Sequence, residues 1–190
     1  MSREEIHDSF VKRFSVPPHK PIRSVTADDL RKVEEKLKIT FPAAYVAFLT
    51  RHGPIFTPGV LDLVTGGESE EAPEGASFDV QEFLDPDEII KTHQLYTSGG
   101  MDDWLIPIAS DCMGNVFGFK CVEYKNRPDD SPLFLFDHDF CEIDEEADSF
   151  DAWLMSFLKL AQTRSRVKWR WRRNRVAVQL VYPVTQGSSA

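Results

Sequence analysis

Apolar residues recur every three or four positions in the first part of the chain, which is the spacing of one face of an α-helix. Ile6, Phe10 and Phe14 fall on such a face, behind a capping-box pattern that begins at Ser2. This pattern predicts a short N-terminal helix. The prolines within residues 16–21 would end the helix and start an extended linker.

Two further helices are predicted between Thr26 and Gly53. Thr26 is a good N-cap residue, and the two aspartates that follow it suit the positive end of a helix dipole. Pro42 suits the first turn of the next helix, and Gly53 lies where a left-handed cap would end it. The apolar positions of this third helix share one face: Phe41, Ala44, Tyr45, Phe48 and Leu49. We interpret the stretch as a builder of the core and not as a catalytic motif.

The period then changes to that of β-strands. Five short runs are apolar or alternate in polarity, and Gly, Pro, Asp or Asn residues bound them. The predicted strands are residues 60–64, 76–84, 104–109, 115–124 and 133–140. A polar loop is expected over 66–75 and a short helix over 85–96.

A last helix is predicted over 148–161, where six apolar residues follow a helical spacing. The carboxylates of 142–151 are interpreted as solvated groups that compensate the dipole at the start of this helix. Helices, then strands, then a helix indicate an α+β protein with a mainly antiparallel sheet. The expected organisation is an N-terminal helix and linker (1–23), a single domain (24–162) and a basic tail (163–190).

The net charge of −9 is unevenly distributed. From Arg164 onward the chain carries seven basic and no acidic residues, so the first 163 residues have a net charge of −16. Such a body repels nucleic acid and attracts cationic partners. The tail places Trp169 and Trp171 among its cations, and three interpretations stay open. It is a loosely structured extension, it docks on the acidic body, or it contacts nucleic acid or a membrane.

Cysteine usage and hydropathy indicate the compartment. Cys112, Cys121 and Cys141 are an odd number without close pairing, which favours a reducing environment over a disulfide framework. No apolar run reaches about 18 residues, and the N-terminus lacks the apolar segment of a secretory signal. We therefore expect a cytoplasmic protein.

Catalytic signatures are sparse. The sequence contains no P-loop, dinucleotide, zincin or hydrolase motif. The alternative to a non-catalytic protein is a metal-dependent enzyme that uses His138, Asp139 and Cys141. Structural zinc sites usually have two close ligand pairs, and here a second pair is missing. A polar turn after a strand explains these residues more simply. We expect no enzymatic activity, no metal and no cofactor.

Two segments resemble the SUKH superfamily, which includes bacterial toxin-immunity proteins and a fungal cell-wall synthesis regulator. One is the helix pair "TADDLRKVEEKLKITFPAAYVAFLTRHGP", and the other is "WLIPIASDCMGNVFGFKC". With the closing "FDAWLMSFL", the resemblance spans residues 26–161. Two turns depart from the family pattern: His52-Gly53-Pro54 replaces Asn-Gly-Gly, and Met113-Gly114-Asn115 replaces a double-glycine turn. The resemblance implies a SUKH-like fold and a binding protein without catalysis, in bacteria most often an antidote to a toxin, frequently a nuclease.

The charge and the resemblance together predict an immunity protein that binds a basic toxin through an acidic surface. An adaptor of the fungal-regulator type is the alternative. Loops carry binding, and a Trp beside acidic residues is a good interface anchor. The predicted partner contacts are Glu68, Glu70, Glu71, Glu74, Asp102, Asp103, Trp104, Asp111 and Asn115.

Overall fold

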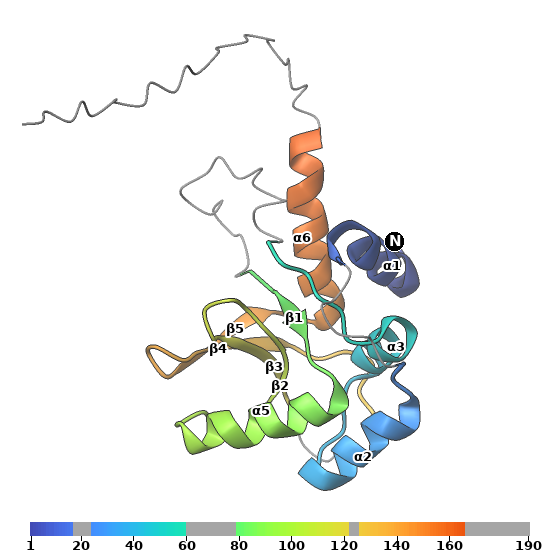
Figure 1. Cartoon of the computed structure of the whole chain (residues 1–190). Helices are drawn as coiled ribbons and strands as arrows, with labels where there is room; N and C mark the ends of the chain where they lie inside the picture. Colours follow the sequence, from blue (N-terminus) through green and yellow to red (C-terminus); the bar gives the residue numbers. More distant parts are fainter. Residues whose placement is uncertain (17–23, 60–78, 122–125, 166–190) are drawn as a thin grey trace, which may run out of the picture.

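Three helices begin with side-chain caps, two of which, at Ser2 and Thr26, are predicted from the sequence. The computed structural model describes residues 1–16, 24–59, 79–121 and 126–165 (Figure 1). The helices that start with a capping box are α1 (Arg3–Phe14), α2 (Ala27–Leu37) and α5 (Pro86–Ser98). The cap pairs are Ser2 with Glu5, Thr26 with Asp29, and Asp85 with Glu88. The predicted helices at these three places are thereby confirmed.

The next helix, α3 (Ala43–His52), follows α2 after a short elbow, and both of its ends differ from the prediction. Pro42 is the N-cap residue just outside the helix and does not belong to its first turn. Gly53 has φ 72° and ψ −175°, so it has the positive φ that suits glycine without the left-handed helical conformation that we expected. That conformation occurs instead at Lys38, after α2, with φ 56° and ψ 51°.

The strands form one antiparallel sheet in the order β1-β2-β3-β4-β5. They are β1 (Glu82–Phe83), β2 (Leu105–Ser110), β3 (Val116–Lys120), β4 (Leu133–Asp137) and β5 (Glu142–Ala147). The predicted strands at 104–109, 115–124 and 133–140 correspond to β2, β3 and β4. The prediction for 76–84 is reduced to a two-residue strand, and the predicted strand at 60–64 and the loop at 66–75 both lie outside the described residues.

Strand β5 corrects the prediction for residues 142–151. The prediction places all of these carboxylates near the start of the last helix. In the structure, Glu142–Ala147 form an edge strand that pairs with β4. Residues 138–141 form the turn between β4 and β5, which confirms a polar turn at the end of the fourth strand.

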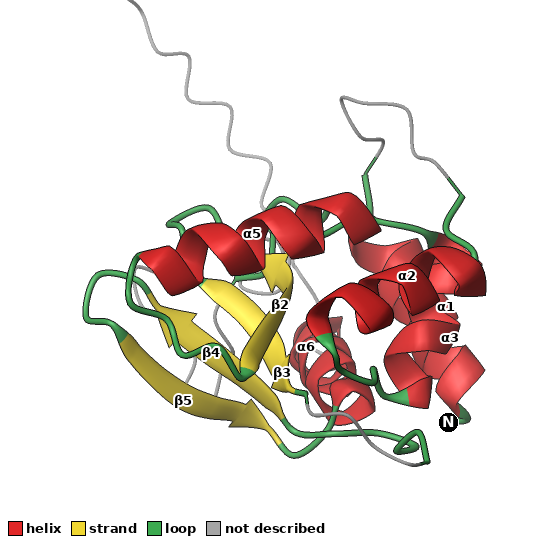
Figure 2. Ribbon diagram, turned by 90° about the horizontal axis from the view of Figure 1, so that it is seen from below, coloured by secondary structure: helices red, strands yellow, loops and turns green. Residues whose placement is uncertain are grey.

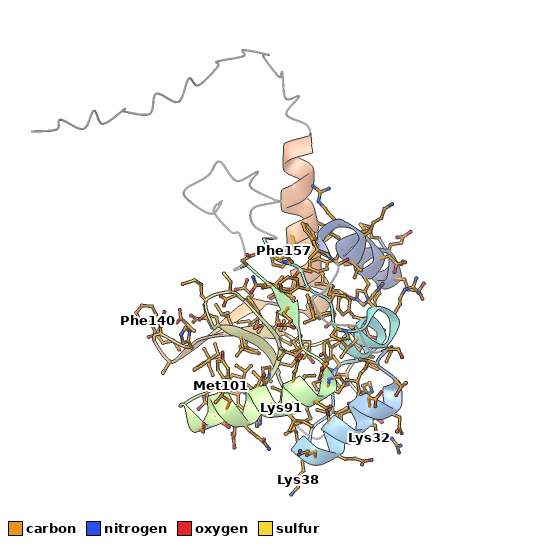
Figure 3. The ribbon with its side chains drawn as sticks, in the orientation of Figure 1. Lys32, Lys38, Lys91, Met101, Phe140 and Phe157 are labelled. Carbon is orange, nitrogen blue, oxygen red and sulfur yellow. The ribbon has the colours of Figure 1, made fainter. Side chains whose placement is uncertain are left out.

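The main core lies between one face of the sheet and the helices α1, α3 and α6 (Phe150–Ser165). The six side chains predicted to be buried together are all fully buried in this core: Tyr45, Phe48, Leu49, Trp153, Leu154 and Phe157. Figure 3 shows Phe157 inside the molecule, between α6 and the sheet. Phe10 and Phe14 bring α1 into the same core, so the N-terminal helix packs on the domain.

The other face of the sheet carries a smaller apolar cluster under α5. Its buried members are Met101, Leu105, Val116 and Phe136, and its half-buried members are Tyr96, Trp104, Phe134 and Ile143. Figure 2 shows α5 lying across the sheet on the side opposite α6. The molecule is therefore a single α+β domain with helices on both faces of an antiparallel sheet, as predicted.

Polar contacts attach α1 to α6. The ring nitrogen Nε2 of the buried His7 lies 2.8 Å from Asp151 Oδ1, and Arg3 donates to the carboxylates of Asp151 and Asp129. These partners, Asp129 first, raise the pKa of Arg3. No helix of the described residues is long and apolar enough to cross a membrane.

Candidate protein-binding surface

The nine predicted partner contacts are distributed over three places in the chain. Glu68, Glu70, Glu71 and Glu74 lie outside the described residues. Asp102, Asp103 and Trp104 lead from α5 into β2, and Asp111 and Asn115 lie beyond the opposite end of β2. The described contacts therefore occupy two separate ends of the sheet.

Trp104 is held by its neighbours and is half-buried. Its Nε1–H donates to Asp102 Oδ2 at 3.0 Å, its ring packs edge-on against Phe134, and Lys120 Nζ lies 5.3 Å from the ring centroid. Asp102 and Asp103 are exposed. This end of the sheet thus presents two carboxylates beside a fixed aromatic ring, but the cation Lys120 already lies over part of that ring.

Asp111 and Asn115 hold the turn between β2 and β3. The Asp111 carboxylate accepts hydrogen bonds from the backbone N–H of Met113 and of Asn115 and from the Asn115 side-chain amide, each at 2.8 Å. Both side chains are buried, with 9% and 7% exposure. Their polar atoms therefore fix the turn, and they offer a partner little surface.

The same turn is tied to the β4–β5 turn and to α5. Asn115 Oδ1 accepts a hydrogen bond from the backbone N–H of His138, and the Tyr96 hydroxyl donates to the Gly114 carbonyl at 2.7 Å. Gly114 has φ 97°, and a Cβ there would meet the His138 ring at 3.1 Å. Three segments far apart in sequence thus form one rigid end of the sheet.

The candidate metal ligands lie in the β4–β5 turn. Side-chain ligand atoms of Asp137, His138 and Asp139 fall within 4.8 Å of one another. The Asp137 carboxylate is already engaged, since it accepts the backbone N–H groups of Asp139 and Phe140. Cys141 points its thiol toward the His138 carbonyl oxygen. The cluster is largely exposed, and exposed carboxylates commonly gather in turns without a metal.

Sequence reasoning missed an apolar pocket of about 290 Å³ between α5 and β4. It is lined by Leu95, Tyr96, Gly99, Phe136 and His138. Leu95 and Tyr96 belong to the predicted helix and Phe136 to a predicted strand, but no local pattern places these elements side by side. Burial raises the pKa of Tyr96, whose ring forms part of the pocket wall.

A larger pocket, of about 420 Å³, lies between α1 and α3 and includes Arg3, His7 and Arg51. Its guanidinium groups are already paired, Arg3 with Asp129 and Asp151, and Arg51 with Asp8 in a two-pronged contact. Burial lowers the pKa of His7 despite Asp151, so this ring adds little positive charge at neutral pH. The pocket therefore has little capacity to attract an anion.

The sheet order, the two flanking helical layers and the elbow before α3 define an α+β domain of the SUKH type. Residues 24–156 match the SMI1 / KNR4 family (SUKH-1), and the chain belongs to this family. The matched region begins after α1 and ends within α6. No curated protein matches the sequence.

Proposed function

We propose that this protein is a non-catalytic binding module that neutralises a basic toxin in the cytoplasm. The observation that carries the proposal is the charge along one edge of the domain. Residues 137–148, from the last residue of β4 through the turn and β5 to the residue after β5, contain seven carboxylates and neither lysine nor arginine. Asp102 and Asp103 add exposed negative charge on the path into β2. Membership of the SUKH-1 family supports the same class of protein.

A nuclease is the favoured type of toxin, for an electrostatic reason. An enzyme that holds a phosphate backbone must be basic along its binding cleft. A carboxylate-rich surface complements such a cleft and accelerates the encounter of the two proteins. The same surface repels nucleic acid, so the inhibitor would not compete with its own target for the substrate.

Two other functions lead to different observations. An adaptor of the fungal-regulator type would bind a partner without protecting any cell from a toxin. A metal-dependent enzyme at His138, Asp139 and Cys141 would contain stoichiometric zinc, and Cys141→Ser would remove the zinc. Elemental analysis of the purified protein distinguishes the enzyme from both binding proteins. Cys112 and Cys141 are exposed free thiols, which supports the reducing compartment that we propose.

The direct test uses the product of the reading frame beside this one. We expect that product to arrest growth when it is expressed alone, to bind this protein when the two are purified, and to be harmless when both are expressed. Growth arrest that this protein does not relieve, together with absence of binding, would contradict the immunity function.

Charge reversal tests the acidic surface itself. Asp102→Lys with Asp103→Lys should slow association by roughly tenfold and weaken its salt dependence, since both carboxylates are exposed. Asp102→Asn with Asp103→Asn keeps an acceptor for the Trp104 indole N–H and should give the same direction of change. The control is Glu35→Lys, whose carboxylate is also exposed but lies on α2 and not on the path into β2. Equal association rates for the reversed protein and the control would contradict a role for Asp102 and Asp103 in partner binding.

A further inference from the structure

The pocket beneath α5 belongs to a larger exposed apolar surface at one end of the sheet. In the described part of the chain, four large apolar side chains are strongly exposed, and one of them is the terminal Met1. The other three are Leu95 (67%), Met113 (66%) and Phe140 (75%). They come from α5, the β2–β3 turn and the β4–β5 turn.

The contacts between these segments hold the three side chains at the same end of the sheet. Tyr96, beside Leu95, donates to Gly114, beside Met113, and Asn115 bonds to His138 of the turn that carries Phe140. Figure 3 shows Phe140 at the tip of the β4–β5 turn, away from α1, α2 and α3. We call the pocket and these three side chains the apolar end. Monomeric proteins seldom expose such clustered apolar groups without a binding role.

Negative charge borders the apolar end. The register pairs Phe136 with Ile143 and Phe134 with Glu145, so Glu145 lies on the face of the sheet that carries the pocket. Glu142 and Asp139 are exposed in and beside the β4–β5 turn. Among the described strands the one cation of this face is Lys120, which lies over Trp104 at the other end of the strands. Helix α5 adds the exposed Lys91, one turn before Leu95. The border that the β4–β5 turn and β5 form is therefore acidic.

We propose that the apolar end receives one large apolar side chain, aromatic or long aliphatic, from a basic segment of a partner protein. Lysine or arginine residues on either side of that anchor would meet Asp139, Glu142 and Glu145. This proposal rests on the proposed function and specifies where the basic partner binds and what it must present. Interface anchors of this kind commonly fill a central pocket within a polar rim.

The size and charge of the site favour this occupant over others. A volume of about 290 Å³ is at the lower end for small-molecule sites, so it fits one side chain better than a cofactor. A second copy of this chain would bring its own acidic border against the first. Nucleic acid and anionic membranes would be repelled for the same reason.

The test uses three peptides with blocked ends and the full-length protein labelled with ¹⁵N. The peptides are Lys-Lys-Trp-Lys-Lys, Lys-Lys-Ala-Lys-Lys and Glu-Glu-Trp-Glu-Glu. We expect saturable chemical-shift changes with the first peptide, centred on the amides of Leu95, Gly99 and His138. The second and third peptides should bind at least tenfold more weakly, because each lacks either the anchor or the charge.

Two substitutions on the protein complete the test. Leu95→Ser and Phe140→Ser remove exposed apolar groups without adding charge, so both variants should fold normally, and each should weaken binding about fivefold. The control Gln94→Ser changes an exposed neighbour on α5 that does not line the pocket and should bind as the wild type does.

Two results would overturn the proposal. One is equal binding of the tryptophan and alanine peptides, which would leave only charge attraction. The other is a wild-type dimer that Phe140→Ser converts to a monomer, which would assign the surface to a second copy.

The proposed function can fail separately. If the neighbouring toxin binds Leu95→Ser and Phe140→Ser as tightly as wild type, the apolar end is wrong and the immunity function stands. If the peptide binds there but no toxin is neutralised, the apolar end stands as a binding site and the immunity function is wrong.

Discussion

The carboxylate of Glu34 offers a quantitative test of how the helical layer is joined to the sheet. Its Oε1 accepts the backbone N–H of Phe41 at 2.8 Å and Nη1 of Arg127 at 2.6 Å, and its Oε2 accepts Nη2 of Arg127 at 3.0 Å. Arg127 also donates to the Phe41 carbonyl. One buried carboxylate therefore ties the elbow between α2 and α3 to the segment that precedes β4.

Replacing Glu34 with alanine removes all three of these acceptor contacts. An unpaired buried N–H at Phe41 costs about 1–3 kcal/mol. Breaking a fully buried ion pair costs about 3–5 kcal/mol, but the side chain of Arg127 is 37% exposed, and water can solvate it in part. We therefore expect Glu34→Ala to lower the free energy of unfolding by about 3 kcal/mol in total. For a domain of this size that corresponds to a fall in Tm of roughly 6–12 °C.

Urea unfolding followed by tryptophan fluorescence measures this change, because Trp153 lies in the core that unfolds. The matched control is Glu35→Ala, the next residue of α2, whose carboxylate is 68% exposed and should contribute less than about 0.5 kcal/mol. Glu34→Gln keeps an acceptor for Phe41 and should fall between the two. If Glu34→Ala and Glu35→Ala had the same unfolding free energy, the assigned role of this carboxylate would be wrong.

Three further predictions concern the core, the pH dependence and the sheet. Phe48→Asp buries an unpaired charge, should cost about 4 kcal/mol or more, and should abolish the cooperative thermal transition; an unchanged Tm would contradict the assigned core. Burial lowers the pKa of His7 in the folded state, so the unfolded chain takes up a proton first as the pH falls, and stability should decline below about pH 6.5. The decline should be shallower in His7→Gln, and parallel Tm–pH curves would refute this. Gly118→Ala would place a Cβ 2.4 Å from a backbone oxygen of the neighbouring strand and should lower the free energy of unfolding by roughly 2 kcal/mol. In the control Gly99→Ala the nearest atom to the new Cβ lies at 3.4 Å, so the same unfolding assay should show almost no change.

The helices were predictable because their signals are local. A cap residue, an acidic first turn and an apolar stripe all lie within one helix, and the Ser2, Thr26 and Asp85 caps form where the sequence has those signals. Strand β5 has no comparable signal. Glu142–Ala147 contains a single large apolar residue, Ile143, so the strand depends on its pairing with β4 and not on its own buried face.

The candidate surface was harder to predict than the fold for a related reason. A carboxylate in a turn can face water or its own backbone, and the sequence does not distinguish the two. Asp111 and Asn115 face inward, whereas Asp102 and Asp103 are exposed. Leu95 lies on the exposed side of α5, four residues after Lys91, whereas the buried Ile89 faces the core. Exposure of this kind is a property of the packing of distant elements.

The two edges of the sheet differ in a way that bears on association. At one edge, β1 is continued by a bridge from Glu82 to Phe56, which in turn bridges to Val16. At the other edge, β5 has no further neighbour among the described strands, and its exposed side chains are carboxylates. An open edge beside exposed apolar groups would ordinarily favour pairing between copies. Like charges along β5 oppose that pairing, while they leave the apolar end accessible to a basic partner. The acidic edge thus favours a basic partner over a second copy of the same chain.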